Sequence, residues 1–284
     1  MLKRNADTFL GCDTEYEEAD IVLFGAPFDS TTSFRPGTRF ASRAMRGDSW
    51  GLEVYSPYQD KELTDSRIMD AGDLELCFGD SRAALDQIRD YSAAILRDRK
   101  IPLMVGGEHL VTLGSVEAAA AQYPELCVVH FDAHTDLRDE YLGAPLSHAA
   151  VIRRCWDLLG DDRIWQFGIR SGERSEFEWA TKHTHLRKFD FVGLDECLTA
   201  LQGKPVYFTL DLDVLDPSVF PGTGTPEPGG VAFRELMEAA VKVASRLNIV
   251  ACDINELSPV YDQSGASTAV ACKILREILL GLQK

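Results

Sequence analysis

The sequence predicts a three-layer α/β/α domain built on a parallel sheet, and two observations support this prediction. Helical periodicity is clearest at residues 81–100 and 233–248, in stretches that lie between short apolar runs. Near-continuous apolar strands separated by helices are typical of a parallel sheet that is covered on both faces. The runs, most of which are too short for helices, are residues 21–26, 67–71, 101–105, 126–131, 163–169, 206–210 and 249–254.

The length and composition fit a single globular domain over residues 1–284. The chain is 45% hydrophobic, which can supply a large core, and α/β domains commonly reach this size. No internal repeat or flexible linker divides it. Its seven cysteines are widely scattered without a C-x-x-C pair, so neither a disulfide framework nor a zinc ribbon is expected.

The charge and the apolar pattern argue against two classes of partner. A formal charge of −16 disfavours nucleic acid, whose phosphates need a basic surface, and is compatible with a small cationic substrate. No apolar run approaches the roughly 20 residues that span a bilayer. Acidic residues follow the basic pair near the N-terminus, where a secretory signal would be apolar. We therefore expect a cytoplasmic protein without membrane or nucleic-acid partners.

The candidate site lies where four predicted strands run into polar sequence, at the end of a parallel sheet where ligands bind. In the segment DAHTD, the side chains Asp132, His134 and Asp136 occupy alternate positions. Residues two apart on an extended chain face the same way, so these three can converge. The alternative is an ordinary polar strand end with capping aspartates.

A second carboxylate pair, Asp211 and Asp213, repeats this spacing, and His109 adds another imidazole. Like carboxylates so close together need a cation or a retained proton. Six such side chains exceed what one cation can use while leaving room for water, so the sequence predicts a dinuclear site with bridging carboxylates. Ligands rich in carboxylate and free of thiolate favour manganese, and leave magnesium, iron and zinc open.

The chemistry of such a site is hydrolysis, because two cations generate hydroxide at neutral pH. Phosphoesters, peptides, lactams and guanidines are all possible substrates. Glu256 follows a further strand without comparable metal partners, and a free carboxylate suits a planar guanidinium. Alternatively, Glu256 begins a helix or pairs with a structural arginine.

Five motifs resemble the ureohydrolase family of arginases and agmatinases, above all its bacterial agmatinases, over nearly the whole chain. They are GGEH at 106–109, DAHTD at 132–136, DLDVLDP at 211–217, GTGTPEPGG at 222–230 and DINELSPVYD at 253–262. The resemblance implies the arginase/deacetylase fold, with a parallel eight-stranded sheet, and two Mn²⁺ per subunit. It also implies a ligand set. His109 and Asp136 would be terminal ligands of one manganese, and His134 and Asp213 of the other. Asp132 and Asp211 would bridge the two ions.

The resemblance further implies that a bridging hydroxide attacks the guanidinium carbon and that urea and an amine are released. Asp136 would orient the hydroxide, Glu256 would hold the guanidinium, and Thr225 would hydrogen-bond near the substrate head. Protonating the leaving amine needs a group with a pKa near neutrality, which points to His148. We expect His148 at a helix start capped by Ser147. Its neighbour is Ala149, where many family members have glycine.

The loop LRDEYLGAPLSH lacks the Asn and Ser pattern with which arginases bind arginine. Asp139 and Glu140 are candidates to attract the ammonium of agmatine, so the predicted reaction is agmatine and water giving putrescine and urea. A basic residue in this region, Arg138 or Arg153, leaves open a guanidino substrate that ends in a carboxylate, such as 4-guanidinobutyrate or guanidinopropionate. Arginine fits less well.

A different metal hydrolase and a catalytically idle binding protein are the alternatives outside this class. The family resemblance implies a homo-trimer or homo-hexamer.

The other histidines are expected to be structural. His130 is expected to point away from the ligands into the core. His183 and His185, flanked by lysines and threonines, are expected in an exposed helix end.

Overall fold

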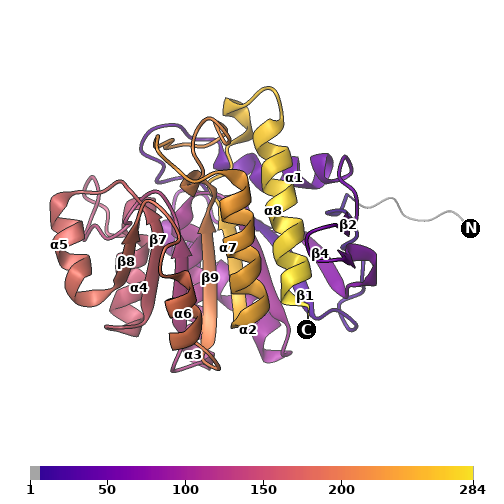
Figure 1. Cartoon of the computed structure of the whole chain (residues 1–284), viewed down its shortest axis with the longest axis horizontal. Helices are drawn as coiled ribbons and strands as arrows, with labels where there is room; N and C mark the ends of the chain where they lie inside the picture. The colour runs from indigo at the N-terminus through magenta and orange to yellow at the C-terminus, as the bar shows by residue number, and fades with distance from the viewer. Residues whose placement is uncertain (1–6, 284) are drawn as a thin grey trace, which may run out of the picture.

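The computed structural model describes residues 7–283, so part of the N-terminal stretch weighed above against a secretory signal lies outside it. Its centre is a sheet of eight strands (Figure 1). The strands are β1 Ile21–Ala26, β4 Ile68–Asp73, β5 Ile101–Gly106, β6 Cys127–Phe131, β7 Ile164–Ile169, β8 His185–Lys188, β9 Pro205–Asp211 and β10 Asn248–Asn255. Their order is β4-β1-β5-β10-β9-β6-β7-β8 and every pairing is parallel. This confirms the predicted fold class.

Helices cover both faces of the sheet, and each face has its own apolar core. One layer lies in front of the sheet in Figure 1 and consists of α6 Leu194–Ala200, α7 Phe233–Arg246 and α8 Ala266–Leu282, with α1 Ala41–Ser49 packed against α8. The other layer consists of α2 Ser81–Arg97, α3 Thr112–Gln122, α4 Val151–Leu159 and α5 Arg174–His183. Among residues 7–283 no helix is both long and apolar enough to span a membrane.

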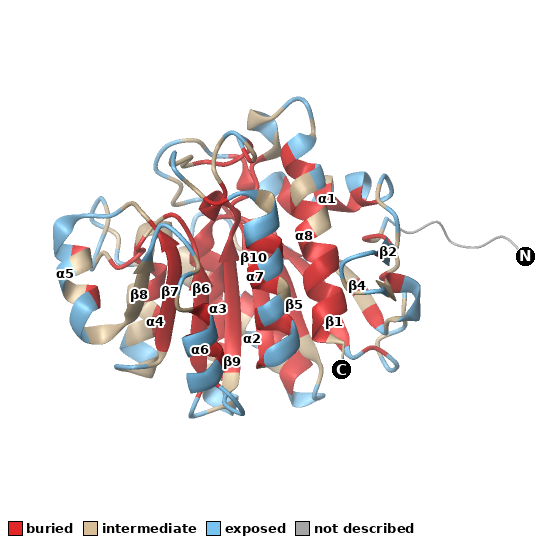
Figure 2. Cartoon of the chain, viewed as in Figure 1, coloured by how far each residue is buried: buried red, intermediate tan, exposed pale blue. Residues whose placement is uncertain are grey.

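The burial of each element explains why its hydrophobic pattern predicts it. The central strands are buried from end to end, whereas helices such as α2 and α7 bury one side only (Figure 2). A strand that is covered on both faces needs apolar side chains at successive positions, so it appears as a continuous run. In α2 the buried residues Ala84, Leu85, Ile88 and Ile95 follow helical spacing. All seven predicted strands are present.

The eighth strand, β8, was not found by periodicity. It has the sequence HLRK and lies at the edge of the sheet. Short, charged edge strands discourage pairing with other chains, and they therefore lack an apolar signal. The prediction that His185 lies in an exposed helix end is wrong: it is in β8, where its ring stacks on Trp165 at 4.0 Å between centroids. His183 does end a helix, half-buried against Trp179.

Short turns follow several strands and place the site residues. The segments η3 His109–Val111 and η5 Leu212–Val214 begin close behind β5 and β9, and η4 His148–Ala150 leads into α4. The remaining short elements are η1 Thr38–Phe40, η2 Leu63–Asp65, η6 Pro259–Tyr261 and the hairpin of β2 Tyr55–Ser56 and β3 Lys61–Glu62.

Candidate metal centre

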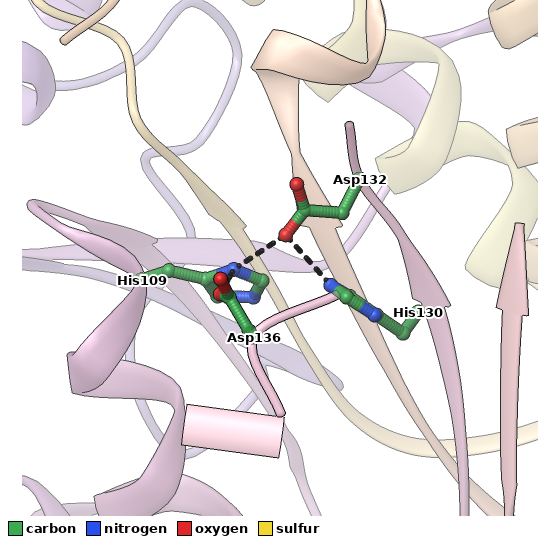
Figure 3. Close-up of side chains that lie close together, drawn as sticks. All are labelled: His109, His130, Asp132 and Asp136. Carbon is green, nitrogen blue, oxygen red and sulfur yellow. Dashed lines mark hydrogen bonds and ion pairs between the residues drawn. The ribbon is translucent and has the colours of Figure 1, made fainter. Parts of the chain in front are cut away.

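The six predicted ligands come together at the carboxyl ends of neighbouring central strands. His109 follows β5, Asp211 ends β9 and Asp132 follows β6, with β10 between the first two strands. The ring Nδ1 of His109 lies 3.0 Å from Asp132 Oδ2, 3.1 Å from Asp136 Oδ2 and 3.4 Å from Asp211 Oδ2. Figure 3 shows His109 and Asp136 on one side of Asp132. These atoms form the first half of the centre.

The second half is formed around His134. Its Nδ1 lies 3.1 Å from Asp213 Oδ2 and 3.4 Å from Asp132 Oδ1. The two oxygens of Asp132 therefore face different imidazoles, His109 through Oδ2 and His134 through Oδ1. A carboxylate placed in this way can bridge two cations.

The charges of the centre call for a cation. Asp132, Asp136, Asp211 and Asp213 are all buried. Burial raises the pKa of Asp211 well above its usual value, and repulsion from Asp213 adds to this. Burial also raises the pKa of Asp136, to about 7, with repulsion from Asp132 as the next cause. Divalent cations would remove both penalties, and oxygen-rich ligands with two imidazoles suit them.

Hydrogen bonds around the centre orient its ligands. His109 Nε2 lies 2.9 Å from the hydroxyl of Thr209 in β9. His130 Nε2 lies 2.8 Å from Asp132 Oδ2 (Figure 3), and its Nδ1 is 3.1 Å from Gln166 Nε2. Because Gln166 Nε2 can only donate, His130 accepts at Nδ1 and donates to Asp132 through Nε2. Such partners fix the orientation of metal ligands.

The contact of His130 corrects the expectation that it points away from the ligands. Residues 130 and 132 are two apart, and a side chain in β6 faces the same side as the residue two positions later. The strict alternation of 130, 132, 134 and 136 was therefore the signal that could have found it. His130 is buried, as expected, but it belongs to the surroundings of the centre.

Backbone strain coincides with the site. Asp136 and Glu256 adopt φ angles of 50° and 67°, in the left-handed region that side chains other than glycine rarely enter. Such residues cost about 1–3 kcal/mol and persist where the surroundings determine them. The loop of Asp136 is held by Glu176, whose Oε1 accepts hydrogen bonds from Thr135 Oγ1 at 2.5 Å and Leu137 N at 3.2 Å.

Glu256 is a buried carboxylate at the end of β10. Its Oε1 accepts a 2.7 Å hydrogen bond from the backbone amide of His109. Burial raises its pKa well above the usual value, and Asp213 adds to the shift. Within residues 7–283 it pairs with no arginine and begins no helix, so neither structural alternative for Glu256 holds. It lines the cleft above the centre.

This cleft, of about 250 Å³, contains the remaining predicted site residues. Thr225 Oγ1 donates to Asp213 Oδ2 over 3.2 Å. His148 Nε2 lies 3.2 Å from Ser33 Oγ, and its ring meets the Tyr141 ring edge-on. Burial lowers the pKa of His148 to about 4, and His134 contributes to the shift. His148 is therefore neutral at pH 7, whereas we expected a pKa near neutrality.

The cap expected at His148 differs in its detail. Ser147 does occupy the position before η4, where a capping residue belongs. Its hydroxyl makes no capping hydrogen bond and is buried without a partner among the described residues. The predicted Ser147 cap is therefore wrong, because the backbone of His148 is held from elsewhere: its amide donates to Thr31 Oγ1 at 3.1 Å.

Sequence reasoning missed two acidic residues that line the cleft. Asp139 and Glu140 do not line it, and Asp139 is exposed and pairs with Arg154. Glu173 and Glu176 line it instead. They precede or begin α5, far along the chain from the metal motifs, and carry no pattern that marks them.

Of the two arginines considered for a carboxylate substrate, only Arg138 lines the cleft. Its Nη1 donates to Glu173 Oε1 at 2.8 Å, and its guanidinium lies over the Tyr141 ring. Arg153 packs instead over the ring of Trp179, 4.4 Å from its centroid.

Comparison with known proteins agrees with this geometry. Residues 19–281 match the model of the arginase family. The chain is 47% identical to an agmatinase of Bacillus anthracis and to one of Bacillus subtilis, in each case over 97% of this chain and 96% of the relative. It superposes on the crystal structure of agmatine ureohydrolase of Thermoplasma volcanium with a TM-score of 0.90 and 35% identity, covering 99% of this chain and 95% of the other. Matches of this extent along the chain show that it belongs to the arginase family.

Proposed function

We propose that this protein hydrolyses agmatine to putrescine and urea with two divalent cations, of which manganese is the preferred one. The observation that carries the proposal is the buried carboxylate of Glu256, free of any arginine partner within residues 7–283, beside the paired carboxylate and imidazole centre. The similarity to agmatinases supports the same substrate.

The proposed metal ligands form two groups, one for each cation, and two carboxylates belong to both groups. His109 and Asp136 would hold one cation and His134 and Asp213 the other, with Asp132 and Asp211 between them. The opposed oxygens of Asp132 support this division. When bound, the two cations supply hydroxide at neutral pH by lowering the pKa of water. Asp136, which lines the cleft, orients the attacking oxygen.

Glu256 and Thr225 receive the guanidinium. One oxygen of Glu256 is taken by the His109 amide, which leaves the other to accept from the substrate. An ionised carboxylate pairs with guanidinium through strong, charge-assisted hydrogen bonds. Thr225 lies beside Asp213 and places a hydroxyl at the substrate head.

His148 moves the proton that the leaving amine needs. Since its pKa is lowered to about 4, it is neutral at pH 7 and carries a proton only while the reaction proceeds. Its Nε2, on the side of Ser33 in the cleft, takes the proton released in the attack and gives it to the amine nitrogen.

One exposed carboxylate, that of Glu173, favours an amine over an acid at the far end of the substrate. Glu173 is exposed and lines the cleft, so it can attract the ammonium group of agmatine. A guanidino acid is the second candidate because Arg138 lines the same region. Arg138 is paired with Glu173 and stacked on Tyr141, so the ion pair leaves less charge on either residue for a substrate, and the preference for agmatine rests chiefly on the similarity to agmatinases.

Urea release tests the proposal directly. The manganese-loaded protein would be given agmatine, arginine, 4-guanidinobutyrate and guanidinopropionate in parallel. We expect agmatine to have the highest kcat/KM. Preference for a guanidino acid would favour the second candidate. Absence of urea from all four, with manganese bound by elemental analysis, would exclude the enzymatic function.

A further inference from the structure

Glu108 is a buried carboxylate next to a predicted metal ligand, and it faces a different part of the chain. It accepts hydrogen bonds from Thr31 N at 2.9 Å, Thr31 Oγ1 at 2.5 Å and Thr32 Oγ1 at 3.0 Å. All three donors lie in residues 27–37, which follow β1 and which we name the Thr31 loop. The backbone of Glu108 joins the same loop, since its amide donates to Phe28 O at 2.8 Å. Glu108 therefore anchors the Thr31 loop to the end of β5.

The same loop holds His148 at two points. Thr31 Oγ1 accepts a 3.1 Å hydrogen bond from the backbone amide of His148, and Ser33 Oγ lies 3.2 Å from its ring Nε2. The other ring nitrogen, Nδ1, is buried and has no hydrogen-bond partner among the described residues. The ring thus depends on the Thr31 loop for its polar contacts.

The polarity of these contacts requires hydrogen-bond acceptors at position 108. The Thr31 hydroxyl has a single hydrogen, and donating it to Glu108 leaves only lone pairs to face the His148 amide. A carboxylate accepts at both oxygens and so fixes this direction. Errors of about 1 Å in the placement of a reacting group can cost on the order of 10²-fold in rate.

We propose that Glu108 and Thr31 are positioning residues, which hold His148 where its imidazole can transfer a proton to the leaving amine. The inference rests on the proposed function for the role of His148, but the contact itself does not. It also gives a physical reason for an acidic side chain next to His109 whose oxygens bond the Thr31 loop.

Thr31→Val tests this proposal, because valine keeps the shape of threonine and removes the hydroxyl. We expect kcat for agmatine to fall on the order of 10²-fold, with KM and manganese content unchanged, since only the placement of the reacting group is lost. Thr31→Ser should restore most of kcat. Glu108→Gln, which puts a donor where an acceptor is needed, should behave like Thr31→Val.

The His148→Ala background separates positioning from general damage. If Thr31 acts through His148, Thr31→Val should lower kcat no further in that background. The same loss in both backgrounds, or wild-type kcat in Thr31→Val, would overturn the proposal.

Hydrogen exchange at the His148 amide tests the contact without turnover, so it remains decisive even if agmatine is not the substrate. Exchange should be faster in Thr31→Val than in the wild type and in Thr31→Ser. Equal rates in all three proteins would overturn the proposal. Failure of the wild type to release urea from any guanidine would count only against the proposed function.

Discussion

The backbone amide of His109 donates a 2.7 Å hydrogen bond to Oε1 of Glu256, and Glu256 N in turn donates to Gly107 O at 3.0 Å. These two contacts tie the end of β5 to the end of β10, which are neighbours in the sheet. They hold the strained φ angle of Glu256 and orient its carboxylate before any substrate arrives. Glu256, which we propose to bind the guanidinium, is therefore held in place by the backbone of His109, a proposed metal ligand.

Glu256→Gln should separate substrate binding from metal binding. Glutamine can still accept from the His109 amide through its oxygen, so manganese content should stay unchanged. Loss of the negative charge removes one partner of a buried ion pair, which typically costs about 2–5 kcal/mol, or at least roughly 30-fold in kcat/KM for agmatine. Glu140→Gln, exposed and outside the cleft, is the matched control. Loss of manganese from Glu256→Gln would contradict the assignment.

His109→Ala and Asp213→Ala should each lower manganese occupancy and urea release together, because each removes one ligand from a different half of the centre. Elemental analysis after dialysis and the steady-state rate are the measurements. His183→Ala, at the end of α5 and outside the cleft, should change neither. Full activity in either ligand variant would refute that ligand.

His130→Ala should weaken manganese binding although His130 is not a proposed ligand. It removes the hydrogen bond to Asp132 Oδ2, and loss of such an outer partner typically costs 10–100-fold in metal affinity. Calorimetric titration of the metal-free protein would measure this. A variant that binds manganese as tightly as the wild type would show that the contact with Asp132 is dispensable.

Glu173→Gln should change substrate preference more than rate. Its side chain is 58% exposed, so its attraction for an ammonium group is screened and worth about 1 kcal/mol or less. Its loss should raise KM for agmatine severalfold. Loss of its pairing frees Arg138, so turnover of 4-guanidinobutyrate should improve relative to agmatine. Glu178→Gln, exposed on α5 outside the cleft, is the control. An unchanged ratio between the two substrates would exclude Glu173 from recognition.

Asp216→Asn should lower thermal stability in a pH-dependent way. Asp216 accepts hydrogen bonds from Ser218 N, Ser218 Oγ, Gly229 N and Gly230 N, and these lower its pKa to about 2, the Ser218 hydroxyl contributing most. The folded pKa lies below the unfolded value of about 4, so the stabilisation is present above pH 4 and is lost as the pH falls towards 2.

We expect a loss of about 1 kcal/mol at pH 7, after allowance for solvent screening, or about 2–4 °C in Tm. Calorimetry at several pH values would show the difference between the two proteins shrinking below pH 4. A difference that stays constant with pH would mean that the charge of Asp216 is not responsible. Asp139→Asn, whose exposed carboxylate forms one ion pair, serves as the control.

The strands and most of the candidate metal ligands could be predicted because they carry a local signal. Burial on both faces demands uninterrupted apolar runs such as β6, and alternate spacing puts Asp132 and His134 on one side of an extended chain. The edge strand β8 lacks that signal because its exposed position favours charged residues. His130 carried the alternating signal as well, and only the phase assigned to it was wrong.

By itself the sequence determined the fold class and indicated most of the candidate metal ligands, since both follow from periodicity along single elements. Only the tertiary structure decided which residues meet across elements. Several contacts of the site join segments that are far apart in the chain. They are the contacts of Thr31 with His148, of Glu108 with Thr31, and of Glu173 with the other residues of the cleft. Their distances depend on how loops pack over the sheet, and no spacing within one segment encodes that packing.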